Sequence, residues 1–412
     1  MSKRKLAVSL LVAGGLVSPV AHATNGYFSH GYGMKAKGMG GVGIALPQDS
    51  LAAASNPAGM VMVGSRLDVG VDWFKPVRST EIVGMGSYDG NGDKSFLIPE
   101  FGYNRMLNAD SSIGLSVYGN GGMNTKYKDL NSRTGNAIFG NGDLGVDLAQ
   151  LFIAPTYAMK LTPDHAIGVS LNLAYQQFKA EGIDGFTVSS SSGTNLTNKG
   201  YDSSTGYGLR IGWLGNITPS VTLGATYQTK TRMSTFDKYR GLFAEQGDFD
   251  IPSNYGVGIA VKLTDTTTVA ADIVEIKYSD TPSVNNPIAN LMVSGNLLGS
   301  NNGGGFGWRD MTVVKLGISH QYQNGLTVRA GYNYGRQPIP ESETMFNVLA
   351  PGVVEDHLTL GATWAMSSKS ELTVGYMHAF KKTINGNPNP PFPTFNIKMH
   401  QDSLGFAYGW KM

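Results

Sequence analysis

Apolar and polar residues alternate with a period of two in segments of roughly ten residues that recur along most of the chain. Segment 66–73 shows the pattern, with one phase occupied by Leu67, Val69, Val71 and Trp73. The same alternation recurs at 167–176, 326–335 and 403–410. Because successive side chains of a β-strand point to opposite faces, each segment is predicted to be a strand with one apolar face and one polar or glycine-containing face.

Two kinds of connection separate the predicted strands. Short turn sequences lie at 108–110, 162–164, 218–220, 264–266, 323–325 and 367–369. Longer polar loops lie at 77–95, 121–147, 181–202, 232–251, 281–310, 339–354 and 383–397. Six turns alternating with seven loops require fourteen strands. This pattern predicts an all-β protein, a transmembrane antiparallel β-barrel with periplasmic turns and extracellular loops.

The ends of the apolar faces favour a membrane barrel over a soluble β-sandwich. They carry aromatic residues, as membrane interfaces do: Trp73, Tyr103, Tyr157, Tyr175, Trp213, Tyr227, Trp364, Phe380 and Trp410. The opposite faces are too polar for a sandwich core. Apart from steric effects, an arginine is therefore expected to be tolerated better at inward positions such as Asn172 or Gly331 than at outward Leu171.

The first residues indicate export from the cytoplasm. Lys3-Arg4-Lys5 precedes a short apolar run at 6–17, and Ala21-His22-Ala23 matches a signal peptidase site. We expect a signal peptide at 1–23 and a Gram-negative outer-membrane location. Beyond residue 23, no run of 18 apolar residues predicts a membrane helix.

Composition excludes several classes of site. The chain has no cysteine, so neither disulfides nor thiolate metal sites are available. The formal net charge is +2 and no block of basic residues suggests binding to nucleic acid. We expect neither a metal nor a cofactor. We also find no Ser-His pairing motif that would indicate a catalytic site.

Residues 24–63 precede the first strand and do not alternate. They contain Gly26, Gly31, Gly33, Gly38, Gly40, Gly41, Gly43 and Gly59. Such a segment cannot lie in lipid with unpaired backbone groups, so it either hangs in the periplasm or fills the barrel lumen. We favour a lumenal plug, termed the hatch, followed by the barrel at 64–412. The hatch ends near Asn56-Pro57-Ala58-Gly59, where Pro57 disfavours helical geometry at Asn56.

Two motifs resemble the long-chain fatty acid transporter (FadL) family, which includes importers of aromatic hydrocarbons. The first is Asn56-Pro57-Ala58-Gly59, and the second is the stretch Phe306-Gly307-Trp308-Arg309-Asp310 that runs into Val314-Lys315-Leu316-Gly317. The resemblance covers the whole mature chain. It implies a channel in which extracellular loops catch an apolar molecule, the hatch closes the lumen, and the molecule diffuses passively and laterally into the membrane.

The resemblance also implies a kink in the third strand. Here that strand, 113–119, is followed by Gly121 and Gly122, and glycines at a strand end (Gly119, Gly121 and Gly122) suit a bend. The alternative is a plain start of the following loop. We expect the Asn56-Pro57 corner to lie against the barrel wall close to this third strand.

Ligand candidates come from the inward phase of the strands. Arg210, Lys315 and Arg329 are candidates for an anionic substrate. The ninth strand carries an inward apolar strip of Ala270, Val274, Ile276 and Tyr278, unless a bulge reverses its phase. Fatty-acid importers of the family carry a basic residue just before the late motif, whereas this chain has Asn302-Gly303-Gly304-Gly305. Both a fatty acid and a neutral aromatic or aliphatic hydrocarbon therefore stay open as substrates.

An outer-membrane β-barrel can also have other functions, and it has partners of its own. The alternatives are a general porin, which needs no Gly-rich plug, and an adhesive outer-membrane barrel. The chain ends in Trp410-Lys411-Met412, whereas family members often end in the Phe that the barrel assembly machinery favours. Besides a hydrophobic small molecule, we expect this machinery, outer-membrane lipid and lipopolysaccharide as partners of a monomer.

Overall fold

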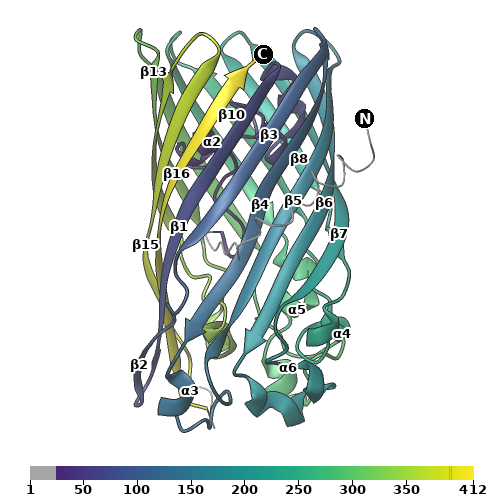
Figure 1. Ribbon diagram of the computed structural model, residues 1–412, viewed down its shortest axis with the longest axis vertical. Coiled ribbons are helices and arrows are strands. Elements are labelled where there is room, and N and C mark those ends of the chain that lie inside the picture. The colour runs from purple at the N-terminus through teal and green to yellow at the C-terminus, as the bar shows by residue number, and fades with distance from the viewer. Residues whose placement is uncertain (1–24, 389, 391) are drawn as a thin grey trace, which may run out of the picture.

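The computed structural model describes residues 25–388, 390 and 392–412, and these form a single closed β-barrel (Figure 1). The expected signal peptide at 1–23 lies outside the described residues. Long strands run from an end with tight turns, at the top of the figure, to an end covered by long loops with short helices. Within the described chain, no helix is long and apolar enough to cross a membrane.

Fourteen antiparallel strands form the wall, which confirms the predicted number. They are β1 (Arg66–Ile82), β3 (Phe96–Asn108), β4 (Ser111–Tyr127), β5 (Leu144–Lys160), β6 (His165–Glu181), β7 (Asp202–Thr218), β8 (Val221–Gln228), β10 (Asn254–Lys262), β11 (Thr267–Ile276), β12 (Met311–Gln321), β13 (Leu326–Gly335), β14 (Asp356–Ala365), β15 (Ser370–Asn385) and β16 (Phe395–Lys411). The short strands β2 (Gly86–Asp89) and β9 (Arg232–Met233) pair alongside β1 and β7, respectively. β16 pairs with β1, so the sheet has no free edge.

The two phases of the strands face lipid and lumen as predicted. Outward residues such as Val69, Trp73 and Leu171 are exposed on the outer surface, whereas inward residues such as Asp72 and Asn172 are buried. The six predicted turns all join neighbouring strands. The strands exceed the prediction at the loop end. β4, for example, continues to Tyr127 although a loop was expected from residue 121, because its backbone stays paired with β5 beyond the apolar band.

The extracellular half of the lumen is filled by apolar side chains of strands and loops. Phe139, Phe178, Phe243 and Phe346 belong to one buried cluster. The loops contain α3 (Leu130–Arg133), η3 (Asp184–Ser189), η4 (Gly193–Asn195), η5 (Asp237–Tyr239), α4 (Ala244–Gly247), η6 (Tyr278–Asp280), α5 (Pro282–Asn285), α6 (Ala289–Met292), η7 (Glu341–Glu343) and η8 (Phe346–Val348). These short elements cover the mouth of the barrel (Figure 1).

The segment before β1 is folded inside the barrel. Its helical turns are α2 (Met34–Lys37), η1 (Ala52–Ala54) and η2 (Pro57–Met62), and most of its residues are buried. α2 contacts β14, β15 and β16, while η2 contacts β4, β5, β6 and β7. The hatch therefore touches opposite sides of the wall and closes the lumen.

The lipid-facing phase gives a test of how deep each outward residue lies in the membrane. Leu171 lies at the centre of the outward row of β6, so Leu171→Arg is expected to cost about 2–4 kcal/mol of unfolding free energy. Thr205→Arg, in the same phase on β7 near the end of the apolar band, should cost about 0–1 kcal/mol. Urea titration in lipid vesicles measures both. Equal losses would contradict the assigned membrane depth.

Candidate functional site: the hatch and the lumen cavity

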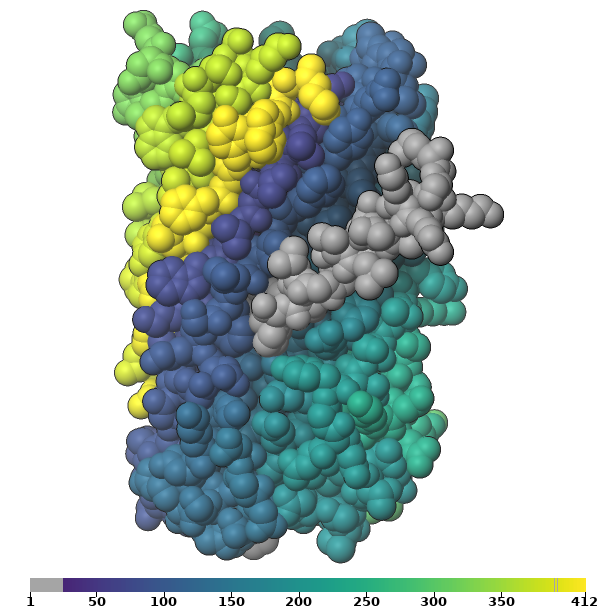
Figure 2. All heavy atoms as spheres, in the orientation of Figure 1, coloured from purple at the N-terminus to yellow at the C-terminus, as the bar shows by residue number. Residues whose placement is uncertain are grey.

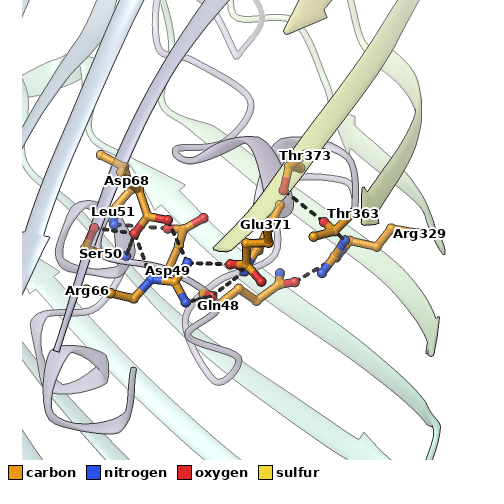
Figure 3. A network of polar contacts seen from close by, with 11 residues as sticks. Gln48, Asp49, Ser50, Leu51, Arg66, Asp68, Arg329, Thr363, Glu371 and Thr373 are labelled. Carbon is orange, nitrogen blue, oxygen red and sulfur yellow. Dashed lines mark hydrogen bonds and ion pairs between the residues drawn. The ribbon is translucent and has the colours of Figure 1, made fainter. Parts of the chain in front are cut away.

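Ion pairs fasten one side of the hatch to the wall (Figure 3). Lys35 of α2 pairs with Glu371 of β15 at 2.5 Å, and Glu371 also accepts from Arg66 at 2.6 Å. The backbone N–H of Ser50 donates to Asp68 at 3.0 Å, and Asp68 pairs with Arg66. These groups are largely buried, and Arg66 holds the two wall carboxylates in place for Lys35 and Ser50 of the hatch. A buried Lys35 would be left without its partner if the hatch moved away from the wall.

Inward charges on other strands bind the hatch backbone. Asp272 accepts the N–H groups of Gly43 and Ile44 at 2.8 and 3.1 Å. Glu100 accepts the N–H of Met34 at 3.0 Å. Lys37 of the hatch pairs with Asp72 of β1 at 2.8 Å. These inward charges thus serve largely as hatch contacts, because a folded plug without a sheet leaves many peptide groups to be satisfied.

The Asn56-Pro57-Ala58-Gly59 corner is a wall anchor. Asn56 has extended backbone geometry (φ −150°, ψ 109°), as the following proline predicts. Its side-chain amide donates to the carbonyls of Ile44 and Trp213 at 2.8 and 2.9 Å, and its Oδ1 accepts from Ala58 N–H. Trp213 is on β7, so the expected place near the third strand is wrong. The corner lies against β6 and β7 because glycines leave room for it there.

Inward glycines allow the hatch to approach the wall closely. A Cβ atom added at Gly168 would lie 2.4 Å from the Pro57 carbonyl carbon, and one at Gly212 would lie 1.9 Å from Asn56 Oδ1. At Gly331 it would lie 2.1 Å from the backbone nitrogen of Gly40. Gly331 faces inward as expected, but an arginine there would clash with the hatch. This inward position faces packed hatch backbone and not open lumen.

The third barrel strand, β4, is where the wall ladder opens. β3 pairs with β4 only as far as Phe101 opposite Val117, and the β4–β5 register shifts between Gly119 and Gly121. The hatch takes up the released backbone groups. Ser29 N–H donates to the Asn120 carbonyl at 3.1 Å, and Gly122 N–H donates to the Tyr27 carbonyl at 2.9 Å. A Cβ at Gly121 would lie 2.0 Å from that same Tyr27 oxygen, so glycine is required there.

A small cavity lies beside this hatch segment. Its lining includes Phe28 and Tyr32 of the hatch, Arg210 of β7, Val274 and Ile276 of β11, and Lys315 of β12. Its volume is about 40 Å³. An apolar cavity of about 150 Å³ can take up benzene, so this one is too small for a hydrocarbon. The structure is thus closed to substrate.

The cavity brings together four of the predicted ligand candidates, Arg210, Val274, Ile276 and Lys315. β11 pairs in unbroken register, so no bulge reverses its phase. Tyr278 is not on that strand, because β11 ends at Ile276. Tyr278 begins η6, and its hydroxyl donates to the carbonyl of Asn25. Arg329 is apart from the cavity, where it donates to Gln48 of the hatch and to Thr363.

Arg210 has unusual partners for a buried cation. Its guanidinium donates to the Ser55 carbonyl at 3.2 Å and to the side-chain oxygens of Gln228 and Asn254 at 2.5 and 3.3 Å. The Thr226 hydroxyl is a fourth acceptor at 3.5 Å. All four acceptors are neutral, and Nε has no partner among the described residues. The cavity lining as a whole contains two cations, Arg210 and Lys315, and one carboxylate, Asp272. It therefore has one positive charge in excess.

The late motif supports the hatch from the extracellular side. Trp308 is buried, donates to Asn347 at 2.6 Å and packs against Tyr27 and Tyr278 at ring-centroid distances of 5.9 and 5.1 Å. Asp310 pairs with Lys277, and Arg309 is exposed. Sequence reasoning did not single out Tyr27, Phe28 or Tyr32 of the hatch. The signal available was three aromatic residues among glycines just after the expected cleavage site.

Taken together, the closed fourteen-stranded wall, the hatch and the lumen cavity define a plugged transport barrel of the bacterial outer membrane. The chain belongs to the outer membrane transport protein family (OMPP1/FadL/TodX), whose family model matches residues 20–410. The resemblance inferred from the two motifs is thereby confirmed. A search of curated proteins gives no match.

Solved structures share the fold. The chain is similar to the Pseudomonas putida toluene transporter TodX, with a TM-score of 0.71 at 19% identity over 93% of this chain and 99% of that one. A Pseudomonas aeruginosa FadL homologue has a TM-score of 0.71 at 14% identity over 94% and 99%. The Ralstonia pickettii toluene transporter TbuX has a TM-score of 0.66 at 19% identity over 93% of this chain and 99% of that one.

Close glycine packing predicts a permeability change. Gly331→Ala places a methyl group in contact with the Gly40 backbone and should displace this side of the hatch, so small polar sugars should enter proteoliposomes faster in a swelling assay. Gly375→Ala is the matched control on β15, because its nearest hatch atom would be 3.3 Å away. Both variants should keep heat-modifiable gel migration. Identical swelling rates would contradict tight docking at Gly331.

Proposed function

We propose that the protein imports hydrophobic molecules that carry a single carboxylate, with long-chain fatty acids as the substrate class. The observation that carries this proposal is Arg210, a buried guanidinium beside the cavity whose partners are all neutral. A buried charge is costly unless it is paired. A carboxylate is the planar anion that a guanidinium binds in two parallel hydrogen bonds, and the free Nε offers one donor for it.

The apolar lining fits the tail of such a molecule. Phe28, Ile44, Val274 and Ile276 surround the cavity, and the aromatic cluster of Tyr27, Tyr278 and Trp308 adjoins it. A neutral hydrocarbon, as the names of the toluene transporters specify for those proteins, would need the apolar walls but not the two cations. The excess positive charge favours the fatty acid over toluene as the substrate of this chain.

Entry requires movement of the hatch, because the cavity is too small for either substrate. The segment from Asn25 to Tyr32 lines the cavity and covers the open part of the β4 ladder, so its displacement would both enlarge the cavity and free the way past β3 and β4. Lateral exit there would let an apolar tail reach the membrane without crossing water. Gly119, Gly121 and Gly122 are the proposed hinge of this exit, and diffusion through it is passive.

The rest of the hatch is proposed to stay fixed. The Asn56-Pro57-Ala58-Gly59 corner and the ion pairs of Lys35 and Lys37 hold it to the wall on opposite sides. On this view residues 1–23 are a signal peptide, 24–63 the hatch and 64–412 the barrel. The filled lumen opposes a general porin. The barrel assembly machinery is a partner in biogenesis, and a single chain suffices for transport.

The carboxylate proposal predicts a selective loss. Arg210→Gln should weaken equilibrium binding of laurate to the purified protein by at least about tenfold, since one charge-assisted hydrogen-bonded contact is worth about 1.5–3 kcal/mol. Toluene binding should change less than about twofold, because toluene makes no use of the charge. Arg329→Gln is the control, an inward arginine apart from the cavity. Equal weakening of laurate and toluene by Arg210→Gln would assign Arg210 to structure alone.

A further inference from the structure

A cluster of basic side chains lies on the outer surface of the barrel, away from the lumen. It spans the three neighbouring strands β1, β16 and β15, of which β1 and β16 adjoin on the face in Figure 2. Lys75 and His378 both lie opposite Asp402 in the ladder, and Lys398 lies opposite Ser79 and Thr383. His400 and Lys381 complete the group, and the charges of Lys75, Lys381 and His378 act on His400. We refer to these residues as the outer basic patch.

A β-bulge adds one lysine to this patch. The β15–β16 register shifts between Ala379 and Lys382, and the two residues in between, Phe380 and Lys381, are both exposed on the outer surface. In regular alternation one of them would point inward. The bulge leaves Lys382 free to pair with Glu355. Bulges commonly re-aim a side chain for a purpose, and here the result is an extra outward ammonium group.

The patch has few acidic partners. Asp402 accepts from His378 Nδ1 at 2.8 Å and from the Tyr376 hydroxyl at 2.7 Å. Among the described residues, Lys75, Lys381 and Lys398 form no ion pair, whereas Lys179 and Lys277 at the same end of the barrel each pair with an acid. Glu81 follows Ser79 in the outward row of β1, further from the membrane, and its carboxylate accepts a hydrogen bond from the Asn396 side chain. The three lysines are thus available to an external anion.

The position of the patch along the strands identifies the layer that it faces. On β1 the outward row runs Val69, Val71, Trp73 and then Lys75, and on β16 it runs Phe406, Leu404 and then Asp402 and His400. The patch therefore begins where the apolar band ends, on the loop side of the barrel. In an outer membrane this is the headgroup level of the outer leaflet, whose glycolipid carries phosphates.

We propose that the outer basic patch binds the phosphorylated headgroup of the outer-leaflet glycolipid, the lipid A part of lipopolysaccharide. Lys75, Lys381 and Lys398 contact the phosphates, and Phe380, Trp73 and Leu404 contact the upper part of the acyl chains. His378, oriented by Asp402, presents its other ring nitrogen to the headgroup. Binding there is separate from transport, since every member of the patch lies on the lipid side of the wall.

Lipid A and its enzymatically dephosphorylated form are the probes. The full-length folded protein in detergent is mixed with each, and binding is measured by native mass spectrometry. Wild-type protein should bind phosphorylated lipid A more tightly. The triple variant Lys75→Gln/Lys381→Gln/Lys398→Gln should bind phosphorylated lipid A at least about tenfold more weakly than the wild type. Each lysine near a charged lipid surface contributes about fivefold to the affinity. Both proteins should bind the dephosphorylated form equally, and their laurate binding should be the same.

The control variant is Lys262→Gln/Lys369→Gln/Lys411→Gln, which removes three exposed lysines at the turn end of the barrel. It should bind phosphorylated lipid A like the wild type. An equal loss of lipid A binding in this control would show that the binding depends only on the net charge of the protein, and it would overturn the proposal. So would equal binding of the two lipid A forms by wild type, or displacement of lipid A by inorganic phosphate at the same concentration, which would indicate a site for small anions.

Discussion

The structure depends on one constraint, that every backbone N–H and C=O group at membrane depth must have a partner. The closed ladder from β1 round to β16 meets it almost everywhere. Beyond Val117, β3 no longer pairs with β4, and the hatch supplies the partners through Tyr27 and Ser29. The part of the wall with the fewest strand-to-strand hydrogen bonds is therefore paired with the N-terminal end of the hatch. Only a few hydrogen bonds join them, and these can be replaced by other hydrogen bonds.

The remainder of the hatch is held differently. Glycine positions such as Gly168, Gly212 and Gly331 bring its backbone against the wall, and buried ion pairs such as Lys35–Glu371 would leave uncompensated charges if it withdrew. A plug that is fixed over most of its length and loosely paired at one end can open locally. In the proposed mechanism, such an opening keeps polar solutes out while an apolar molecule passes to the side.

The alternation of apolar and polar residues predicted most of the fold. It predicted strand number, turns and the two faces, because lipid on one side and a filled lumen on the other impose a strict period of two. It also placed Arg210 and Lys315 inward. The alternation shows whether a side chain faces inward, but not where it lies inside the barrel. Arg329 faces inward like Arg210 and Lys315, so it was not distinguished from the cavity residues. The path of the Gly-rich hatch follows from tertiary packing, which is why Asn56 was expected near β4 and lies against β7.

A disulfide between the hatch and β4 tests the central claim most directly. Ser29 and Asn120 flank the bridged pair Phe28–Gly121, and the natural chain has no cysteine, so Ser29→Cys/Asn120→Cys introduces a single possible bond. Fatty acid uptake by proteoliposomes is measured with the bond oxidised and again after reduction. The account predicts that uptake stops on oxidation and returns on reduction. Equal uptake in both states would show that this hatch segment does not open during transport.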